Sequence, residues 1–176
     1  MRLTAYPTDE SDLRFDFSAA VWCDKHDLTN TVFDGVDFII KEPDRQIWLE
    51  VKNWEGSSLP AHRRGGQRRS FLAKLNSKAF FTQTLRAKFI GTCAYVALTG
   101  TALREDVVYT ALLESPRMDS ALMSHATTRL RGLVKRDNIW HYTDGNGVRV
   151  PIKVNAAVLN VAEWNVRFPD YPIQAI

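Results

Sequence analysis

Three ionisable residues stand close together in residues 35 to 56, "GVDFIIKEPDRQIWLEVKNWEG". Asp37 lies in the first half of this stretch, and Glu50 and Lys52 lie two residues apart in the second half. Both halves alternate apolar and polar residues, which predicts two strands. Because strand side chains alternate between faces, Glu50 and Lys52 share one face with Trp48 and Trp54. The opposite face of that strand is expected to be apolar, with Ile47, Leu49 and Val51.

The turn between the two strands sets their register. Pro43 and Asp44 are good central turn residues, since proline presets φ and aspartate tolerates the required backbone. If Glu42 pairs with Arg45 around this turn, Asp37 falls opposite Glu50, with Cβ atoms roughly 5 Å apart. A bulge would shift this register. If the register holds, the repulsion between the two carboxylates must be relieved by a proton, by a nearby ammonium or by a divalent cation.

A divalent cation fits this arrangement best. Mg²⁺ prefers oxygen ligands and is usually held by one or two carboxylates together with substrate phosphates. Lys52 is one strand step beyond Glu50, where it can orient or help to deprotonate an attacking water and place positive charge beside a reacting phosphate. The catalytic candidates are therefore Asp37, Glu50 and Lys52, and the metal ligands Asp37 and Glu50. The chemistry they indicate is phosphodiester hydrolysis.

The pattern of Asp37 followed by Glu50-Val51-Lys52 on the next strand, "GVDFII…IWLEVKNW", resembles the signature of the PD-(D/E)XK nuclease superfamily. The local wording is most similar to its NERD-like and Holliday-junction-resolvase-like branches. The resemblance covers residues 35 to 56 clearly and the following helix and strand more loosely. It implies an α/β restriction-endonuclease-like fold, a mixed central sheet flanked by helices, with Mg²⁺ (or Mn²⁺ in its place) and DNA cleavage. One departure is Val36, where the family has proline.

The resemblance also implies a further carboxylate from an element before Asp37. Glu10, Asp12 and Asp16 are the candidates, and the sequence does not choose among them. Asp12, 25 residues before Asp37, is at a comfortable distance and is added as a candidate metal ligand. Taken singly, each is better explained as a surface acid or as one favoured by a helix dipole.

The distribution of charge points to a polyanion, although the net charge is only +3. No acidic residue occurs from Gly56 through Arg104. "AHRRGGQRR", residues 61 to 69, joins four arginines to two glycines directly after the candidate strand. Glycine permits close backbone approach, and the arginine fork suits phosphate. The alternative is a solvated basic loop. The predicted nucleic-acid-binding residues are Arg63, Arg64, Arg68, Arg69, Lys74 and Lys78.

The composition is that of an ordinary globular protein, with 45% hydrophobic and 24% charged residues. The length of 176 residues predicts a single domain, residues 1–176. Cys23 and Cys93 make no disulfide framework or zinc pattern, and Cys93 is expected to be a buried small hydrophobe. The chain shows no secretory signal and no apolar stretch of membrane-spanning length, so we expect a cytoplasmic protein without membrane partners.

The remaining elements are predicted from periodicity. A helix capped by Ser70 should bury Phe71, Leu75, Ala79 and Leu85. Residues 92–100 are expected to form a buried central strand, and 107–114 fit a strand or a helix. Residues from Thr8 fit a helix with Leu13, Phe17, Ala20 and Val21 inward, although "LRFDF" also alternates like a strand.

The final third should add three further elements to the fold. A helix is expected from Pro116, with Ala121, Leu122, Leu130, Leu133 and Val134 as its apolar set. A hairpin with its tip at residues 144–147 should follow, and then a strand in "AAVLNVAEW".

Two hypotheses of function follow. The first is a metal-dependent nuclease acting on DNA, whose substrate geometry (duplex, single strand or four-way junction) stays open. Junction resolution would require a homodimer, because two strands must be cut in register, and the need for a protein partner in a larger nuclease complex is also open. The second is a catalytically silent nucleic-acid-binding or complex-assembly module that uses the same basic face.

Overall fold

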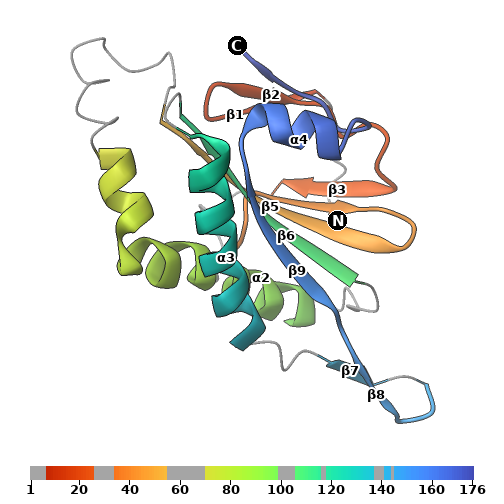
Figure 1. Ribbon diagram of the computed structural model, residues 1–176. Coiled ribbons are helices and arrows are strands. Elements are labelled where there is room, and N and C mark those ends of the chain that lie inside the picture. Colours follow the sequence, from red (N-terminus) through yellow and green to blue (C-terminus); the bar gives the residue numbers. More distant parts are fainter. Residues whose placement is uncertain are drawn as a thin grey trace.

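The centre of the computed structural model is a five-stranded mixed sheet (Figure 1). The structure describes residues 7–25, 34–54, 70–98, 106–115, 118–136, 141–143 and 145–176. In spatial order the strands are β3 (Trp22–Lys25), β4 (Phe38–Lys41), β5 (Arg45–Asn53), β6 (Asp106–Glu114) and β9 (Val154–Leu159). The pairs β3–β4 and β4–β5 are antiparallel, and β5–β6 and β6–β9 are parallel. The expectation of a mixed sheet flanked by helices is confirmed.

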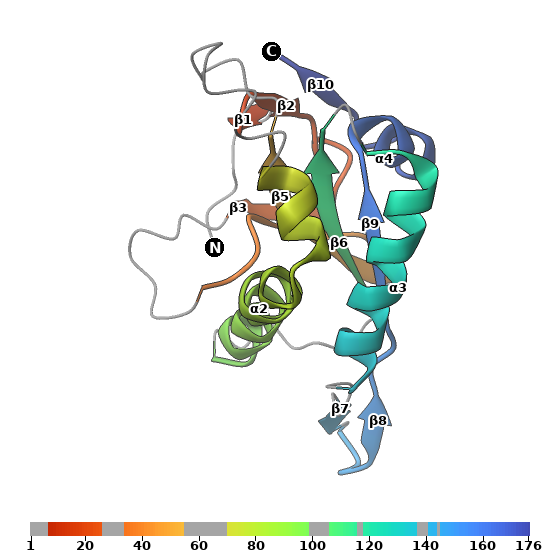
Figure 2. The same ribbon diagram turned by 60° about the vertical axis from the view of Figure 1, so that its left-hand side comes forward.

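One face of this sheet is covered by helices, which Figure 2 shows in front of β5, β6 and β9. They are a helix over residues 70–76, the π-helix η2 (Phe80–Leu85), α2 (Arg86–Leu98) and α3 (Ser120–Arg136). Trp48 of β5 and Tyr109 of β6 pack here against Phe89 of α2. This layer therefore depends on aromatic residues from both the sheet and the helices.

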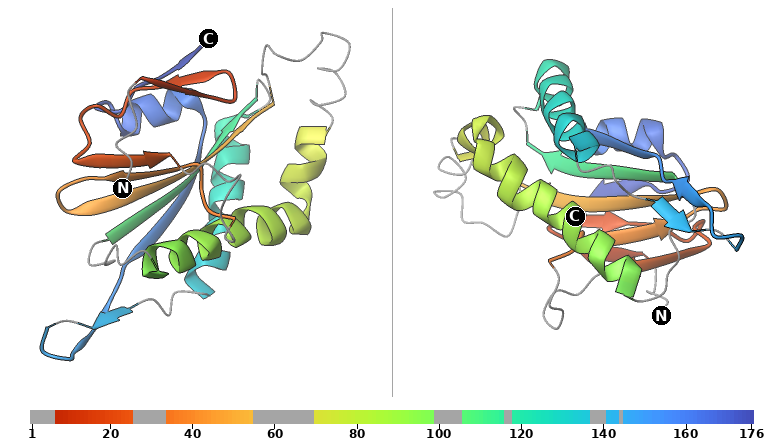
Figure 3. Two further views of the ribbon diagram at one scale, coloured as in Figure 1. Left: turned by 180° about the vertical axis from the view of Figure 1, so that it is seen from behind. Right: turned by 90° about the horizontal axis from the view of Figure 1, so that it is seen from below.

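The opposite face carries a small sheet and a short helix, which the left view of Figure 3 shows on the other side of the central strands from helix 70–76 and α2. The small sheet has the order β1 (Thr8–Glu10), β2 (Leu13–Phe15), β10 (Ile173–Ala175), and the helix is α4 (Val161–Arg167). Phe15, Phe17 and Phe38 form a tightly packed aromatic group, with ring centroids 5.0 to 5.6 Å apart. A second core thus closes the other side of the sheet.

A two-stranded hairpin, β7 (His141–Thr143) with β8 (Arg149–Pro151), projects from one end of the molecule (Figure 1). Its turn includes Gly147 at φ +80°, a conformation that favours glycine. The predicted hairpin is confirmed, and residue 144 of its predicted tip lies outside the described residues.

The strand predicted at residues 92–100 is wrong, because α2 extends to Leu98 as a helix. Phe89, Cys93 and Val96, spaced by four and three residues, form its buried stripe, and Leu98 is 72% exposed. A short apolar run is compatible with both a buried strand and a buried helix, and here the continuing helical stripe decided the outcome. The central position assigned to this segment is taken by β6, which settles 107–114 as a strand.

The helix predicted from Thr8 is also wrong, because this region forms strands β1, β2 and β3. Leu13 and Phe15 alternate with exposed Arg14, so the strand pattern of "LRFDF" was the correct alternative. Leu13 and Phe17 are buried as expected, whereas Val21 is 59% exposed.

Smaller differences concern helix ends and single side chains. Ser70 is itself helical, and Ala79 is exposed because the helix is interrupted at Ser77. The third predicted helix begins at Ser120 rather than Pro116, where the Asp119 side chain accepts a hydrogen bond from the backbone N–H of Leu122. Leu130 and Val134 of its predicted apolar set are buried and Ala121 is exposed. In "AAVLNVAEW" only the first four residues are strand, and α4 begins at Val161.

The two cysteines lie on different faces of the sheet. Cys93 belongs to the helical side and Cys23 to the opposite core, and both are buried, as expected for Cys93. Within the described residues, none of the helices combines the length and apolar content needed to cross a bilayer.

Candidate active site

The predicted hairpin register is confirmed. Phe38 pairs with Leu49 and Ile40 with Ile47, and the backbone N–H of Glu42 donates to the carbonyl of Arg45 across the turn at 2.9 Å. Continuing this register by one residue sets Asp37 opposite Glu50. The sequence alternation is confirmed for β5, where Trp48 and Leu49 lie in different cores. Val36 does not follow the alternation, because β4 begins only at Phe38 and the chain bends at Asp37. Its side chain belongs to the same core as Trp48.

Asp37, Glu50 and Lys52 meet on the helical face of the sheet. Oδ2 of Asp37 accepts a hydrogen bond of 2.7 Å from the backbone N–H of Val51, the residue between the other two. Oε1 of Glu50 lies 2.6 Å from Nζ of Lys52. Glu50 is fully buried, and the Lys52 side chain is 33% exposed. The three candidates are therefore brought together, and Lys52 links the buried carboxylate to the surface.

Lys88 of α2 adds a second ammonium that was not singled out from the sequence. Its side chain is 7% exposed, and its Nζ lies 2.7 Å from Oδ1 of Asp34 and 3.9 Å from Oε2 of Glu50. Lys88 lies in the segment from Gly56 through Arg104, which lacks acidic residues. Only a helical interpretation of residues 92–98 would have placed it on the buried side of α2. From Lys88, the residues four and eight positions on are Thr92 and Val96, and both are buried.

The segment before Asp37 is fixed by its contact with α2. The backbone N–H of Val36 donates to Oγ1 of Thr92 at 2.9 Å, and that hydroxyl donates to the carbonyl of Lys88. At Gly91 an added Cβ would lie 2.4 Å from the carbonyl oxygen of Asp34. Glycine is therefore required for this close approach, and α2 positions both Lys88 and the chain leading to Asp37.

A π-helix precedes α2 and introduces an irregular turn next to the site. It covers Phe80–Leu85, and the hydroxyl of buried Tyr109 donates to the carbonyl of Leu85 at 2.8 Å. Such π-segments are frequent at functional sites. The contact with β6 fixes the point at which α2 begins, and with it the position of Lys88 one turn further on.

The electrostatics of the site are unfavourable to two bare carboxylates. Burial raises the pKa of Glu50 to about 7, with a further contribution from the charge of Asp37, while Lys52 and Lys88 oppose the shift. Burial also raises the pKa of Asp37, against the hydrogen bond from Val51. Burial lowers the pKa of Lys52, but the negative charges of Glu50 and Asp37 outweigh it and raise the pKa above its ordinary value. A carboxyl group with so raised a pKa in a charged cluster is a functional-site candidate.

The donor atoms suit a hard cation, since both side chains are carboxylates and the charge of Asp37 acts on Glu50. Oε1 of Glu50 lies 2.6 Å from Nζ of Lys52, and among the described residues no hydrogen-bond donor reaches Oε2. Buried oxygens in this state are costly unless a donor or a cation satisfies them. The residues present therefore fit a divalent cation between Asp37 and Glu50.

A third acidic ligand is not assembled among the described residues, which contain no group of three or more histidine, cysteine or acidic side chains able to hold a metal. Asp12 occupies the β1–β2 turn at φ 61°, and Asp16 accepts a hydrogen bond from the backbone N–H of Ser18. The charge of Glu10 adds to the effect of burial in raising the pKa of Asp37, while Glu10 itself pairs with Lys25 at 3.1 Å. Of the three N-terminal candidates, all of them described residues, Glu10 is thus the one whose charge raises the pKa of Asp37.

The predicted nucleic-acid-binding residues are only partly placed. Arg63, Arg64, Arg68 and Arg69 lie outside the described residues. Lys74 is exposed, with its Nζ 5.9 Å from the ring centroid of Trp54, directly beyond β5. Lys78 lines a groove against α3 together with Arg129. Lys74 and Lys78 are four residues apart, but the helix is interrupted at Ser77, so the two lysines have different surroundings.

No protein-family model, curated protein or solved structure matches this chain. The function is therefore inferred from the geometry of the site.

Proposed function

We propose that the chain is a metal-dependent nuclease that hydrolyses phosphodiester bonds, in DNA, by the PD-(D/E)XK mechanism. The observation that carries this proposal is the cluster at β5: Asp37 accepts a hydrogen bond from the backbone N–H of Val51, next to Glu50, and the Lys52 ammonium lies 2.6 Å from Glu50. We also propose that the fold is restriction-endonuclease-like, and the mixed sheet flanked by helices supports this.

Asp37 and Glu50 would hold the cation, Mg²⁺ or Mn²⁺, through their carboxylate oxygens. When bound there, such a cation supplies Lewis-acid polarisation of the scissile phosphate and lowers the pKa of water. The hydrogen bond from Val51 to Asp37 fixes the direction of one carboxylate. The position of Glu50 in the middle of a nine-residue strand paired on both sides fixes the other.

Lys52 acts on the reacting groups from the exposed side of the site. Its ammonium can orient a water for attack and can stabilise the negative charge that develops on the phosphate in the transition state. Lys88 lies behind Glu50, and together with Asp34 it provides a fixed charge environment for that carboxylate. Lys88 is therefore a positioning residue in this scheme, and Lys52 a catalytic one.

The decisive experiment is cleavage of end-labelled duplex, single-stranded and four-way-junction DNA by the purified chain in Mg²⁺, in Mn²⁺ and in excess chelator. Asp37→Asn is the principal variant, because it removes one charge at nearly constant volume. Asp106→Asn is the matched control, since Asp106 is an exposed aspartate at the far end of β6.

We expect cleavage that requires the metal, is retained by Asp106→Asn and falls by at least 100-fold in Asp37→Asn. Cleavage that survives Asp37→Asn would mean that another site or a contaminant is responsible. DNA binding without cleavage in any metal would favour the silent binding module.

A further inference from the structure

The outer edge of β9 is covered by one row of side chains on α3, and Figure 2 shows the helix running beside this strand. Oγ1 of Thr127 accepts from the backbone N–H of Val158 at 2.9 Å and donates to its carbonyl at 3.3 Å. Four residues on, Nε of Arg131 donates to the carbonyl of Ala156 at 2.8 Å. Residues four apart lie on one helix face, so Lys135 is the next member of this row.

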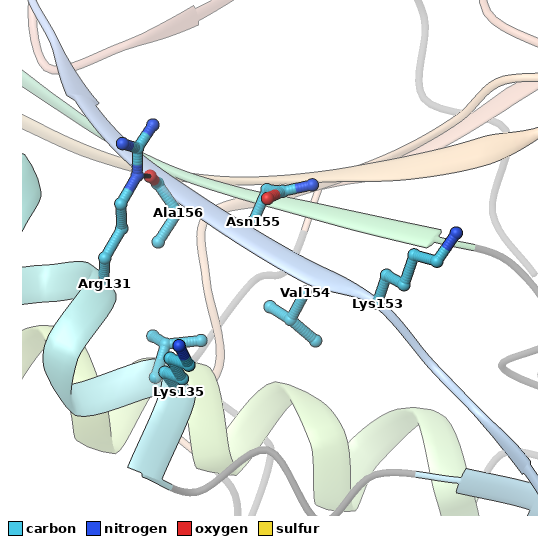
Figure 4. Close-up of a pocket in the computed structure, with 7 residues that line it drawn as sticks. Arg131, Lys135, Lys153, Val154, Asn155 and Ala156 are labelled. Carbon is cyan, nitrogen blue, oxygen red and sulfur yellow. Dashed lines mark hydrogen bonds between the residues drawn. The ribbon is translucent and has the colours of Figure 1, made fainter.

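Beyond Arg131 the helix and the strand leave a groove of about 370 Å³ between them. Its apolar lining comes from Val134, Val154 and Ala156, and its polar lining comes from both elements, as Figure 4 shows. The polar residues are Arg131, Lys135, Lys153 and Asn155. Among the described residues, three cations and an amide thus line this groove and no carboxylate does.

The positive charge extends past the groove along the same side of the molecule. Burial lowers the pKa of Arg167, and the like charges of Arg131 and Arg45 lower it further. Arg131, Lys135 and Lys153 are themselves exposed, so their charges are available to a ligand. Because Arg131 and Arg167 carry like charges that act on each other, this side of the groove gains from an anion.

We propose that this groove binds a backbone phosphate of the nucleic acid on which the proposed nuclease acts; the choice of nucleic acid depends on that proposed function. An arginine fork and two lysine ammonium groups suit phosphate oxygens. An acidic peptide adding a strand to β9 would need the edge groups of Ala156 and Val158, and α3 already occupies three of these. The groove is therefore better suited to a phosphate than to an added strand.

The spacing from the candidate active site suits a duplex. Glu50 is level with Ala111 and Val158 across the sheet, and Val154 lies four residues back along β9. Two strand spacings and four strand residues correspond to about 16 Å. At 3.4 Å per base pair, this straight-line distance from Glu50 equals the length of about five base pairs. The groove would therefore hold the backbone beside the cleavage position rather than at it.

The test is the salt dependence of binding to a fluorescein-labelled 20-base-pair duplex, measured by anisotropy in excess chelator so that cleavage does not interfere. The variants are Lys135→Gln, Lys153→Gln and the double variant. Arg14→Gln is the control, because it removes one exposed cation from the β1–β2–β10 sheet.

Each single groove variant should weaken binding several-fold and make the negative slope of log K against log salt shallower by about 0.9, and the double variant by about 1.8. Arg14→Gln should leave the slope unchanged. Equal slopes for the groove variants and the control would overturn the proposal, as would a wild-type chain that does not bind the duplex.

A polyglutamate peptide provides the alternative ligand. If the lysine variants weaken polyglutamate binding while DNA binding is unaffected, the groove is a peptide site and the proposal fails. A further outcome is that the lysine variants make the salt slopes of DNA binding shallower as expected while the wild-type chain does not cleave DNA with Mg²⁺ or Mn²⁺. In that case the groove proposal stands and the proposed nuclease function fails.

Discussion

Strand β5 separates an apolar interior from a second interior in which a buried charged cluster lies beside an aromatic core. On one face Ile47, Leu49 and Val51 enter a core built from phenylalanine, tyrosine and tryptophan side chains. On the other, Glu50 lies fully buried within a cluster of charged groups, with two ammonium nitrogens within 4 Å of its carboxylate. Burying a charge is costly even when it is paired, whereas burying an apolar side chain is favourable.

The difference indicates what each face is for. The apolar face stabilises the fold. The charged cluster on the other face holds Asp37 and Glu50, whose pKa values are raised by burial, and burying such groups lowers the stability of the fold. Sites that oppose stability in this way are expected where function requires them. Alternation along a single strand therefore lets neighbouring residues serve these separate roles, and substitutions can separate the two.

The largest expected effect is on catalysis. Replacing Lys52 by glutamine should lower the single-turnover rate of DNA cleavage by about 10²–10⁴-fold, because the positive charge beside the reacting phosphate is lost. Urea unfolding accompanies the rate measurement, because Lys52 also pairs with the fully buried Glu50 at 2.6 Å and its loss should destabilise the fold as well. Arg14→Gln provides the charge control. A Lys52→Gln chain that cleaves at the wild-type rate would remove Lys52 from the mechanism.

The next largest effect should come from the opposite face. Leu49→Ala should reduce the free energy of unfolding by about 2–5 kcal/mol, because Leu49 is fully buried in the apolar core. The exposed Val166→Ala, in α4, should change it by less than about 0.5 kcal/mol. Urea unfolding gives both values. Loss of cleavage in fully folded Leu49→Ala would contradict the separation of roles.

The charged face should make stability depend on pH in the absence of metal. Glu50 is neutral in both states below its ordinary pKa of 4.5, and between pH 4.5 and about 7 only the unfolded chain ionises it. Stability is thus lost as the pH rises through this window, by roughly 3 kcal/mol in all.

Glu50→Gln removes this ionisation, so it should match the wild-type stability near pH 4 and exceed it by up to about 3 kcal/mol at pH 8. Urea unfolding in chelator at the two pH values measures the difference. An advantage of Glu50→Gln that is no larger at pH 8 than at pH 4 would show that Glu50 is not held in an unfavourable environment.

The smallest effects compare two helical glycines. Gly91→Ala should destabilise the chain by about 1–3 kcal/mol, because the new methyl group would meet the backbone of Asp34. Gly132→Ala in α3, which has nothing within 4 Å, should stabilise it by about 0.5–1 kcal/mol. Thermal unfolding measures both. Equal responses at the two positions would mean that segment 34–36 is not docked on α2.

The hairpin that carries the site could be predicted from the sequence because its determinants are local. Alternation assigns the faces of β5, and a turn at Pro43 and Asp44 fixes which residues of the two strands face each other. These two rules are enough to predict that Asp37, Glu50 and Lys52 lie close together.

Contributions from distant segments could not be predicted in the same way. Residues 92–98 are apolar enough for a strand or a helix, and only their packing against the sheet makes them part of α2. Interpreting them as a strand concealed Lys88, Gly91 and Thr92, whose roles depend on contact with a segment more than 50 residues earlier. The sequence could not decide between a helix and strands at the N-terminus, although "LRFDF" alternates like a strand, because the strands are only three or four residues long.

The most direct test of the central claim is the binding of Mn²⁺, followed by the loss of the electron paramagnetic resonance signal of the free ion. The wild-type chain should bind about one Mn²⁺ ion that Mg²⁺ displaces, and Asp37→Asn and Glu50→Gln should each weaken that binding at least tenfold, since each removes one of two carboxylate ligands. Binding that is equally strong in Asp37→Asn, or no binding by the wild-type chain at millimolar Mn²⁺, would contradict a cation site between these two strands.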